Sequence, residues 1–301
     1  MTALAQARPA GPARSGGLRR RLLRATPYLL LLPGLLWLLV FFVWPSIQMF
    51  LVSVSAGSLE DGFRLTFTTK SYATALSRFP HQFGNSLLYS GLATVATFLI
   101  GFPVAYTVAF RGGRYKNLLL FLVIAPFFTS FLIRTISWKV LLGDEGPLLA
   151  FLKHVLHILP EGFSILGTPV AVVAGITYNF LPFMILPLYV ALEKIDPRLI
   201  EAAKDLYASH WEAFRRVTFP LALPGVFAGS LLTFIPAMGD YVNATLLGTP
   251  QTQMIGNVIQ NRFLITNDYP VAAALSFILM AGIFIAVSVY ARVLGTEDLT
   301  G

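Results

Sequence analysis

Six long apolar runs constrain the fold of this chain more than any other feature. The hydrocarbon core of a bilayer needs about 20 helical residues to cross it. The runs cover residues 28–54, 86–110, 118–142, 169–192, 220–242 and 271–291. The first, second, fourth and sixth contain no Asp, Glu, Lys or Arg, whereas the third holds Arg134 and Lys139 and the fifth holds Asp240. None alternates as a barrel strand does, so we predict an all-α polytopic membrane protein with six transmembrane helices.

The composition agrees with this class of protein. Charged residues make up only 12% of the chain and the mean hydropathy is +0.71, whereas soluble proteins carry about 25% charged residues. The chain has no cysteine, which excludes disulfide scaffolds, thiolate metal sites and cysteine nucleophiles. Its net charge of +8 would be compatible with a polyanionic partner, so the positions of the charged residues must be considered.

The basic residues are distributed unevenly between alternate connections, and this bias sets the orientation of membrane helices. With residues 1–27 inside, the cytoplasmic segments hold 15 Lys and Arg and the outer segments hold 5. We therefore predict a multi-pass protein of the bacterial inner membrane with both termini in the cytoplasm. Its partners include membrane lipid, and the basic excess reflects topology rather than nucleic-acid binding.

The chain divides into three predicted parts. Residues 1–27 are rich in Ala, Pro, Gly and Arg, cannot bury a core, and are expected to be a disordered basic segment. Residues 28–292 form the transmembrane domain, in which Pro33 and Pro45 are expected to kink the first helix. Residues 293–301 form a short cytoplasmic tail.

Two outer connections are expected to hold short amphipathic helices, at 147–159 and 254–263, which are too short to span a bilayer. His154 and His157 share a face of the first of these, but the nearest acid, Glu161, lies beyond Pro160. Two imidazoles without an aligned third ligand are a weak metal signal. We predict an interfacial helix here and no metal site.

The cytoplasmic connection 193–219 holds ten charged residues yet has clear helix signals. Asp196 followed by Pro197 is a helix start, and Ser209 with Glu212 forms a capping box that starts a second helix, expected to end before Pro220. A turn at Tyr207 separates the two helices. Such a helical elbow either docks a partner or lies as a solvated connector on its own membrane domain.

This elbow carries a family resemblance. Residues 201–209 have the sequence EAAKDLYAS, and Trp211, Phe214, Val217, Pro220 and Pro224 follow at fixed spacing. The segment resembles the EAA loop of ABC importer permeases. The resemblance implies a type I ABC importer permease-like fold whose cytoplasmic coupling helix seats in a separate ATPase subunit. The residues that it assigns to this coupling contact are Glu201, Ala202, Ala203, Asp205, Leu206 and Tyr207.

One of these residues departs from the family pattern, which usually has glycine where this chain has Tyr207. Tyrosine at a turn with positive φ costs roughly 1 kcal/mol or more. Either the turn is remodelled, or Tyr207 contributes directly to the ATPase interface.

The resemblance also implies partners and a division of labour. The implied partners are a dimer of ATP-binding subunits, a second permease subunit and an extracytoplasmic substrate-binding protein. The second permease subunit is either identical to this chain or similar to it. ATP belongs to the ATPase subunits and no cofactor is expected in this chain. In agreement, the sequence contains no Gly-Lys dipeptide and so no phosphate-cradling loop of the Walker type.

Further stretches are similar to the permeases for spermidine and putrescine. They are PFFTSFLIR at 126–134, LPFM at 181–184, LPLY at 186–189, IPAMGD at 235–240, MIGNVI at 254–259 and NDYP at 267–270. The implied function is half of the translocation pathway for a polyamine. The alternatives are import of another small solute or, more remotely, secondary transport. The sequence lacks the internal repeats and the carboxylate array expected of a secondary transporter. A membrane enzyme is disfavoured because the spans hold one acid and no histidine.

Four polar or aromatic residues within the spans are candidates for the translocation pathway. Asp240 near the outer end of the fifth span either meets a cationic solute or pairs with Arg134, which lies at a similar depth. For Asn179, a helix–helix hydrogen bond is favoured over a role in ligand binding. Tyr178 either offers a cation–π face or packs in the bundle.

Overall fold

The computed structural model describes residues 30–58, 62–151, 153, 160 and 162–293. The predicted disordered segment 1–27, most of the predicted tail, and both His154 and His157 lie outside the described residues. The chain forms two compact units, Met1–Leu51 and Val52–Gly301. Each is described below by itself.

The first unit contributes most of an apolar helix that runs over Leu30–Ser53 and is long enough to cross a membrane. Its side chains are almost all exposed, as expected of a helix that is apolar on every side and faces lipid. A π-helical turn, η1 (Leu39–Val43), precedes α2 (Trp44–Ser53), and the Trp44 N–H donates to the Leu39 carbonyl. Pro45 follows directly, and proline cannot donate to the regular α-helical ladder. The irregularity predicted at Pro45 is thus a π turn.

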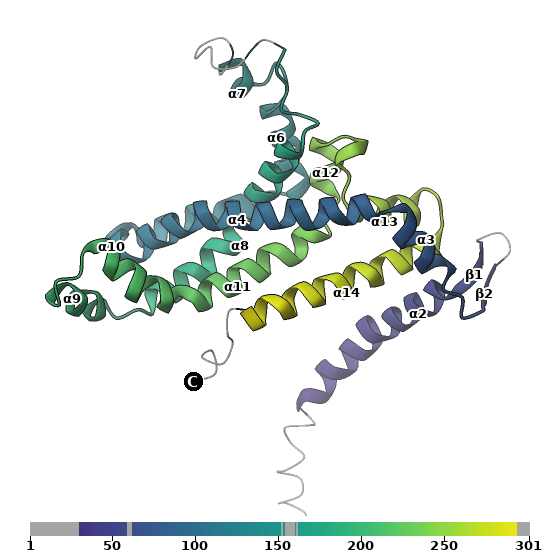
Figure 1. The fold of residues 1–301 in the computed structure, drawn as a ribbon, viewed down its shortest axis with the longest axis horizontal. Helices are drawn as coiled ribbons and strands as arrows, with labels where there is room; N and C mark the ends of the chain where they lie inside the picture. The colour runs from purple at the N-terminus through teal and green to yellow at the C-terminus, as the bar shows by residue number, and fades with distance from the viewer. Residues whose placement is uncertain (1–29, 59–61, 152, 154–159, 161, 294–301) are drawn as a thin grey trace, which may run out of the picture. The chain divides into compact units, whose positions relative to one another are not determined.

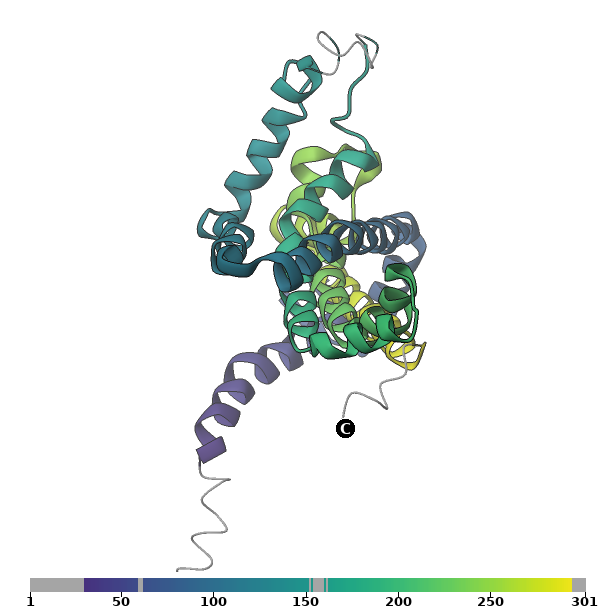
Figure 2. The same ribbon diagram turned by 90° about the vertical axis from the view of Figure 1, so that its left-hand side faces the viewer.

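The second unit is built on three closely packed helices, α4 (Pro80–Arg111), α8 (Pro169–Glu193) and α11 (Phe219–Met238) (Figures 1 and 2). Small residues allow the close approach. A Cβ added at Gly229 of α11 would lie 2.8 Å from the sulfur of Met184 on α8, and one added at Gly101 of α4 would lie 3.3 Å from the same side chain. Glycine at helix contacts lets backbones approach in membranes, where lipid is as apolar as the helices.

The two ends of this bundle carry different connections (Figure 1). At one end lie the short helices α9 (Pro197–Asp205) and α10 (His210–Ala213), with an ion pair between Lys116 and Glu193. At the other end, the Ser86 hydroxyl of α4 accepts a hydrogen bond of 2.9 Å from the backbone N–H of Ile255. The elements there are α12 (Val242–Leu247), η6 (Pro250–Thr252) and α13 (Ile255–Leu264). Helix α13 confirms the helix predicted at 254–263.

The last long helix, α14 (Tyr269–Val293), packs against α13 and α3 (Lys70–Arg78) through the apolar cluster of Ala75, Ile255, Val258, Val271 and Leu275. The strands β1 (Ser55–Ser58) and β2 (Gly62–Leu65) precede α3 and form an antiparallel pair in which Ser55 is opposite Leu65.

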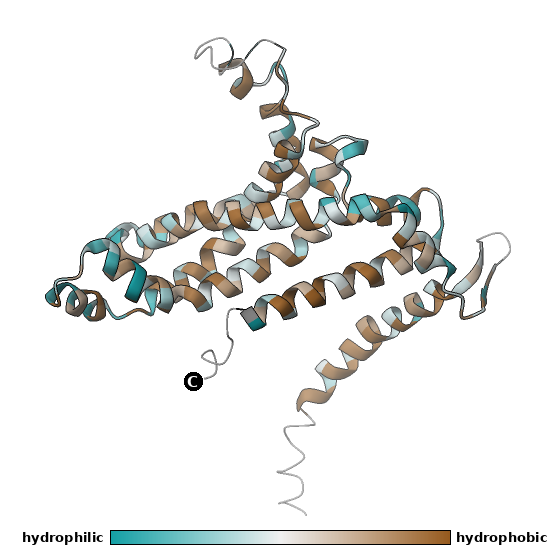
Figure 3. Cartoon of the chain, in the orientation of Figure 1, coloured by the Kyte–Doolittle hydropathy of each residue, from teal (hydrophilic) through white to brown (hydrophobic). Residues whose placement is uncertain are grey.

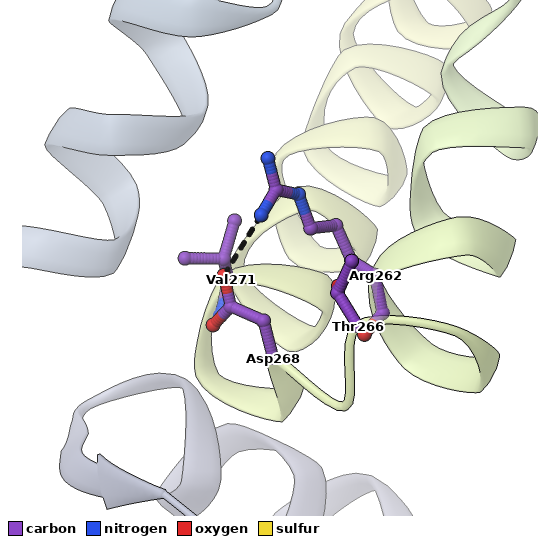
Figure 4. A network of polar contacts seen from close by, with 4 residues as sticks. All are labelled: Arg262, Thr266, Asp268 and Val271. Atoms are coloured by element: carbon purple, nitrogen blue, oxygen red, sulfur yellow. Dashed lines mark hydrogen bonds and ion pairs between the residues drawn. The ribbon is translucent and has the colours of Figure 1, made fainter.

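A small polar network fixes the turn between α13 and α14 (Figure 4). The Arg262 guanidinium lies 3.4 Å from a carboxylate oxygen of Asp268, and the other oxygen accepts from the N–H of Val271 at 3.4 Å. The Thr266 hydroxyl donates to the Arg262 carbonyl at 3.2 Å. Asp268 therefore caps the start of α14 while it pairs with the end of α13.

The third predicted span, 118–142, is not one straight helix. The structure has η2 (Gly113–Tyr115), α5 (Lys116–Ile124) and η3 (Ala125–Phe128), then α6 (Phe131–Leu141), and the two halves are bent by 94°. Pro126 cannot donate to the carbonyl four residues earlier, and Thr129 is extended with ψ 151°. The described part of the chain therefore has five helices able to span a bilayer, or six if this bent pair counts as one.

Beyond α6 the chain continues into α7 (Pro147–Ala150), which is the described beginning of the helix predicted at 147–159.

Candidate functional site

The elbow between α8 and α11 begins as its sequence predicts. The carboxylate of Asp196 accepts a hydrogen bond of 2.9 Å from the backbone N–H of Arg198, and Pro197 occupies the first position of α9. The cap satisfies one of the free N–H groups at the helix start, and proline costs nothing at a position whose N–H is unpaired. A carboxylate also favours the positive end of the helix dipole.

Helix α9 ends in a Schellman motif with tyrosine in its left-handed position. The N–H of Tyr207 donates to the carbonyl of Lys204 at 2.9 Å, and the N–H of Ala208 donates to the carbonyl of Ala203 at 3.0 Å. These two bonds define the motif. Tyr207 has φ +61° and its side chain is 98% exposed. Of the two alternatives for the departure from glycine, the remodelled turn is therefore wrong.

The second arm starts with the predicted capping box. The Ser209 N–H donates to the Glu212 carboxylate at 2.9 Å and the Glu212 N–H donates to the Ser209 hydroxyl at 3.2 Å. This helix does not end before Pro220. It passes from α10 through a π-helical turn, η5 (Phe214–Thr218), into α11 and forms one helix, His210–Met238. Pro220 has no N–H to donate to the α-helical ladder, and the π turn before it lets the helix continue without that hydrogen bond. The elbow is therefore directly continuous with the fifth span.

An aromatic cluster joins the elbow to α4. The Phe214 ring stacks on Trp211 at a centroid distance of 5.4 Å and meets Phe102 of α4 edge-on at 5.6 Å. Tyr106 of α4 and Phe219 of α11 complete the contacts of Phe214. Aromatic pairs of this geometry add about 0.5–1.5 kcal/mol beyond burial. The elbow is thus in aromatic contact with two helices of the bundle, α4 and α11.

The predicted coupling residues lie together on α9 and the turn after it. All are exposed except Ala203, which is half-buried; they are Glu201, Ala202, Ala203, Asp205, Leu206 and Tyr207. Figure 3 shows the polar colouring of this end of the bundle against the apolar colouring of the long helices. The elbow therefore presents both charged groups and large apolar side chains to its surroundings.

Asp240 is buried, with 7% of its surface exposed, and its carboxylate caps the first backbone N–H groups of α12. One carboxylate oxygen accepts from the backbone N–H groups of Val242 at 2.8 Å and Asn243 at 3.1 Å. The other oxygen accepts from the side-chain amide of Asn243. Three donors thus compensate for the removal of this carboxylate from water.

Asn179 of α8 extends this network across the bundle. Its side-chain amide donates to the Thr135 hydroxyl of α6 at 3.0 Å and to the carbonyl oxygen of the Asn243 side chain at 3.1 Å. The predicted helix–helix hydrogen bond is confirmed. Thr135 and Asn243 were missed by the sequence analysis, in which the only available signal was that both are polar residues near the ends of apolar runs.

Arg134 does not pair with Asp240, which corrects one of the two expectations for that carboxylate. Its guanidinium lies over the rings of Phe127, at 4.9 Å, and Phe131, at 5.8 Å. Its buried Nε and Nη1 atoms have no hydrogen-bond partner in the described structure. Thr135, rather than Arg134, is the neighbour of Asn243, and both oxygens of Asp240 already accept hydrogen bonds at the start of α12.

Tyr178 packs against Trp138 of α6 with ring centroids 5.3 Å apart. This contact supports the packing alternative for Tyr178. Among the described residues there is no group of three or more His, Asp or Glu side chains placed to hold a metal ion.

Comparison with solved structures defines the fold first. The chain superposes on a permease chain of a bacterial ABC transporter that imports the acidic polysaccharide alginate, with a TM-score of 0.75, 18% identity, and coverage of 94% of this chain and 99% of that one. A chain of the MetNI methionine ABC transporter gives a TM-score of 0.56 and 18% identity over 73% of this chain and 97% of that one. The fold is that of a type I ABC importer permease.

Sequence comparison then gives the family. Residues 97–294 match the family of binding-protein-dependent transport system inner membrane components, and the chain belongs to this family. It is 40% identical to the spermidine/putrescine transport system permease protein PotB of Haemophilus influenzae over 85% of this chain and 90% of that protein. PotB of Escherichia coli is 37% identical over 85% and 93%. The inner membrane ABC transporter permease protein YdcU of the same species is 30% identical over 83% and 84%.

These relatives are named as transport permeases and not as enzymes. The chain is accordingly a multi-pass inner membrane permease subunit of an ABC importer.

Proposed function

We propose that this permease subunit imports a polyamine, spermidine or putrescine. The single observation that supports this substrate is the 40% identity to PotB of Haemophilus influenzae over most of both chains. The described structure adds a restriction: the buried carboxylate Asp240 is engaged by three donors of α12. Both oxygens of this carboxylate are therefore already used in hydrogen bonds within the chain.

The chain acts with partners in this proposal. A second permease subunit supplies the other half of the pathway, an extracytoplasmic binding protein delivers the solute, and a dimer of ATPase subunits binds and hydrolyses ATP. The elbow docks on one ATPase subunit, and both termini lie on that cytoplasmic side. The opposite end of the bundle, with α13 and the Arg262–Asp268 network, faces the binding protein.

Coupling follows from the contacts of the elbow. When the ATPase subunits close on ATP, they displace α9 and α10. Because α10 is continuous with α11 and Phe214 packs on α4, the displacement reaches both helices together. Packed aromatic rings transmit such a shift because protein interiors are close-packed and deform little.

The proposal is tested with the permease reconstituted in proteoliposomes with its second permease and ATPase subunits. The expected result is ATP-dependent uptake of spermidine or putrescine delivered by the binding protein. Preferential uptake of a neutral sugar or an amino acid would overturn the substrate. Glu201→Lys in the same preparation is expected to abolish uptake while the protein still inserts into the membrane. A reversed charge at a packed interface costs several kcal/mol, which lowers the affinity for the ATPase subunit about a hundredfold or more.

A further inference from the structure

Tyr207 occupies a backbone conformation that tyrosine adopts at a cost. The left-handed region disfavours residues with a Cβ by roughly 1–2 kcal/mol, and the C′ position of a Schellman motif is usually glycine for that reason. The two hydrogen bonds of the motif, from Tyr207 to Lys204 and from Ala208 to Ala203, require φ to stay positive. Within this chain, the ring of Tyr207 does nothing to offset this cost, because 98% of the side chain is exposed.

The residues around Tyr207 share its exposure. Leu206 is 82% exposed and Trp211 is 67% exposed, so three large apolar side chains face outward within six positions of a charged connection. Exposed apolar groups gathered in one place mark interaction sites more often than chance. Residues held in disfavoured backbone conformations also concentrate at binding sites. The two observations are independent and fall on the same residue.

From this geometry we infer that Tyr207 is the anchor of the elbow, and that its ring inserts into an apolar pocket of the ATPase subunit. The inference rests on the proposed function, since it takes the ATPase as the partner. Tyrosine is enriched among the few residues that dominate interface energies. Its rigid ring buries a large area, and its hydroxyl finds a hydrogen-bond partner at the pocket rim. The left-handed turn directs this ring away from the two helices of the elbow.

A protein pocket fits this site better than a membrane surface. Segments that bind anionic lipid carry an excess of Lys and Arg. Residues 193–219 hold five Lys and Arg and five Asp and Glu, so the elbow has no such excess.

The decisive variant is Tyr207→Gly, because glycine is the best residue for the observed turn. The permease in nanodiscs is expected to be as stable as the parent protein or more so. Its affinity for the purified ATPase subunit is expected to fall about thirtyfold or more, as loss of a dominant interface residue does. Tyr207→Phe is expected to keep most of the affinity. The matched control is Phe67→Gly, since Phe67 is also an exposed aromatic residue with positive φ (+48°) and 71% exposure, but lies before α3.

A labelling experiment identifies what covers the site. The chain has no cysteine, so Tyr207→Cys gives a single thiol without background. In nanodiscs this thiol is expected to react with a water-soluble maleimide, and added ATPase subunit is expected to protect it. Protection by the lipid alone would overturn the inference in favour of a membrane contact.

Failure of the anchor and failure of the proposed docking give different results. If Tyr207→Gly binds the ATPase subunit like the parent while Ala203→Asp does not bind, the elbow docks but Tyr207 is no anchor. If Ala203→Asp also binds and transports like the parent, the docking itself is wrong.

Discussion

Phe214 of the elbow meets Phe102 of α4 edge-on, with ring centroids 5.6 Å apart and ring planes at 87°. Phe102 is buried and Phe214 is half-buried, so the pair lies where the elbow joins the bundle. No covalent path of comparable length connects these residues, since they are on different helices far apart in the chain. Together with the contact between Tyr106 and Phe214, the pair joins the elbow directly to α4.

Phe214→Leu is expected to uncouple transport from ATP hydrolysis. Leucine keeps most of the apolar volume but loses the aromatic contacts, each worth about 0.5–1.5 kcal/mol. Uptake per ATP hydrolysed in proteoliposomes should fall severalfold while the ATPase subunit still binds. Phe227→Leu is the matched control, because Phe227 stacks on Tyr290 between α11 and α14 at 5.1 Å, away from the elbow. An equal loss of coupling in both variants would argue against a specific route through Phe214.

Asn179→Leu is expected to lower stability by about 1–2 kcal/mol, because interhelical hydrogen bonds in membrane proteins contribute about 0.6–1.7 kcal/mol. The change removes the bonds to both Thr135 and Asn243. The measurement is the unfolding transition in detergent. Thr177→Val serves as control, since the Thr177 hydroxyl bonds only to the Val173 carbonyl of its own helix. Equal stabilities of the two variants would mean that the network across α6, α8 and α12 contributes little.

Asp240→Asn is expected to destabilise the protein by about 1–3 kcal/mol. One carboxylate oxygen becomes an NH₂ group, so a buried N–H donor at the start of α12 loses its acceptor. Uptake of spermidine and putrescine should fall in the same proportion, as a structural role predicts. A greater loss for the more highly charged spermidine would instead assign Asp240 to the solute, since the Coulombic share of attraction grows with charge. Asp268→Asn is the control at a half-buried cap, where 34% of the side chain is exposed and the ion pair with Arg262 is worth about 1 kcal/mol or less.

The predicted orientation is tested with a reporter enzyme that is active only outside the cytoplasm. A fusion after Gly301 is expected to be inactive, because the basic residues favour a cytoplasmic C-terminus. A fusion after Thr266, in the turn between α13 and α14, is expected to be active. The reverse pattern would invert the whole topology.

Local signals in the sequence were sufficient for the elements of the elbow. The cap at Asp196, the capping box of Ser209 and Glu212, and the turn at Tyr207 each depend on residues within a few positions of one another. Hydrogen bonds between such neighbours form wherever the helix forms. The apolar runs were equally sufficient for five spanning helices, because the bilayer imposes its length on each helix separately.

The two exceptions within the helices both lie close to a proline. The sequence analysis expected a helix end before Pro220 and a single span over 118–142, which includes Pro126. The chain instead continues past Pro220 through a π turn, and bends by 94° after Pro126. Proline removes the same N–H in both places. Whether a helix then bulges or breaks depends on the neighbouring helices that supply substitute partners, and no pattern in the sequence contains that information.

Sequence alone therefore determined the fold class, the basic asymmetry and the elbow with its family signature. Only the tertiary structure decided which polar residues meet. Asp240 and Arg134 were matched by charge and depth, yet Asp240 caps α12 and Arg134 lies over two phenylalanine rings. Asn179 meets Thr135 and Asn243, which lie 44 and 64 residues away along the chain. Side-chain hydrogen bonds depend on helix rotation and on separations of a few tenths of an ångström, which are set by packing across the bundle and not by the order of residues along it.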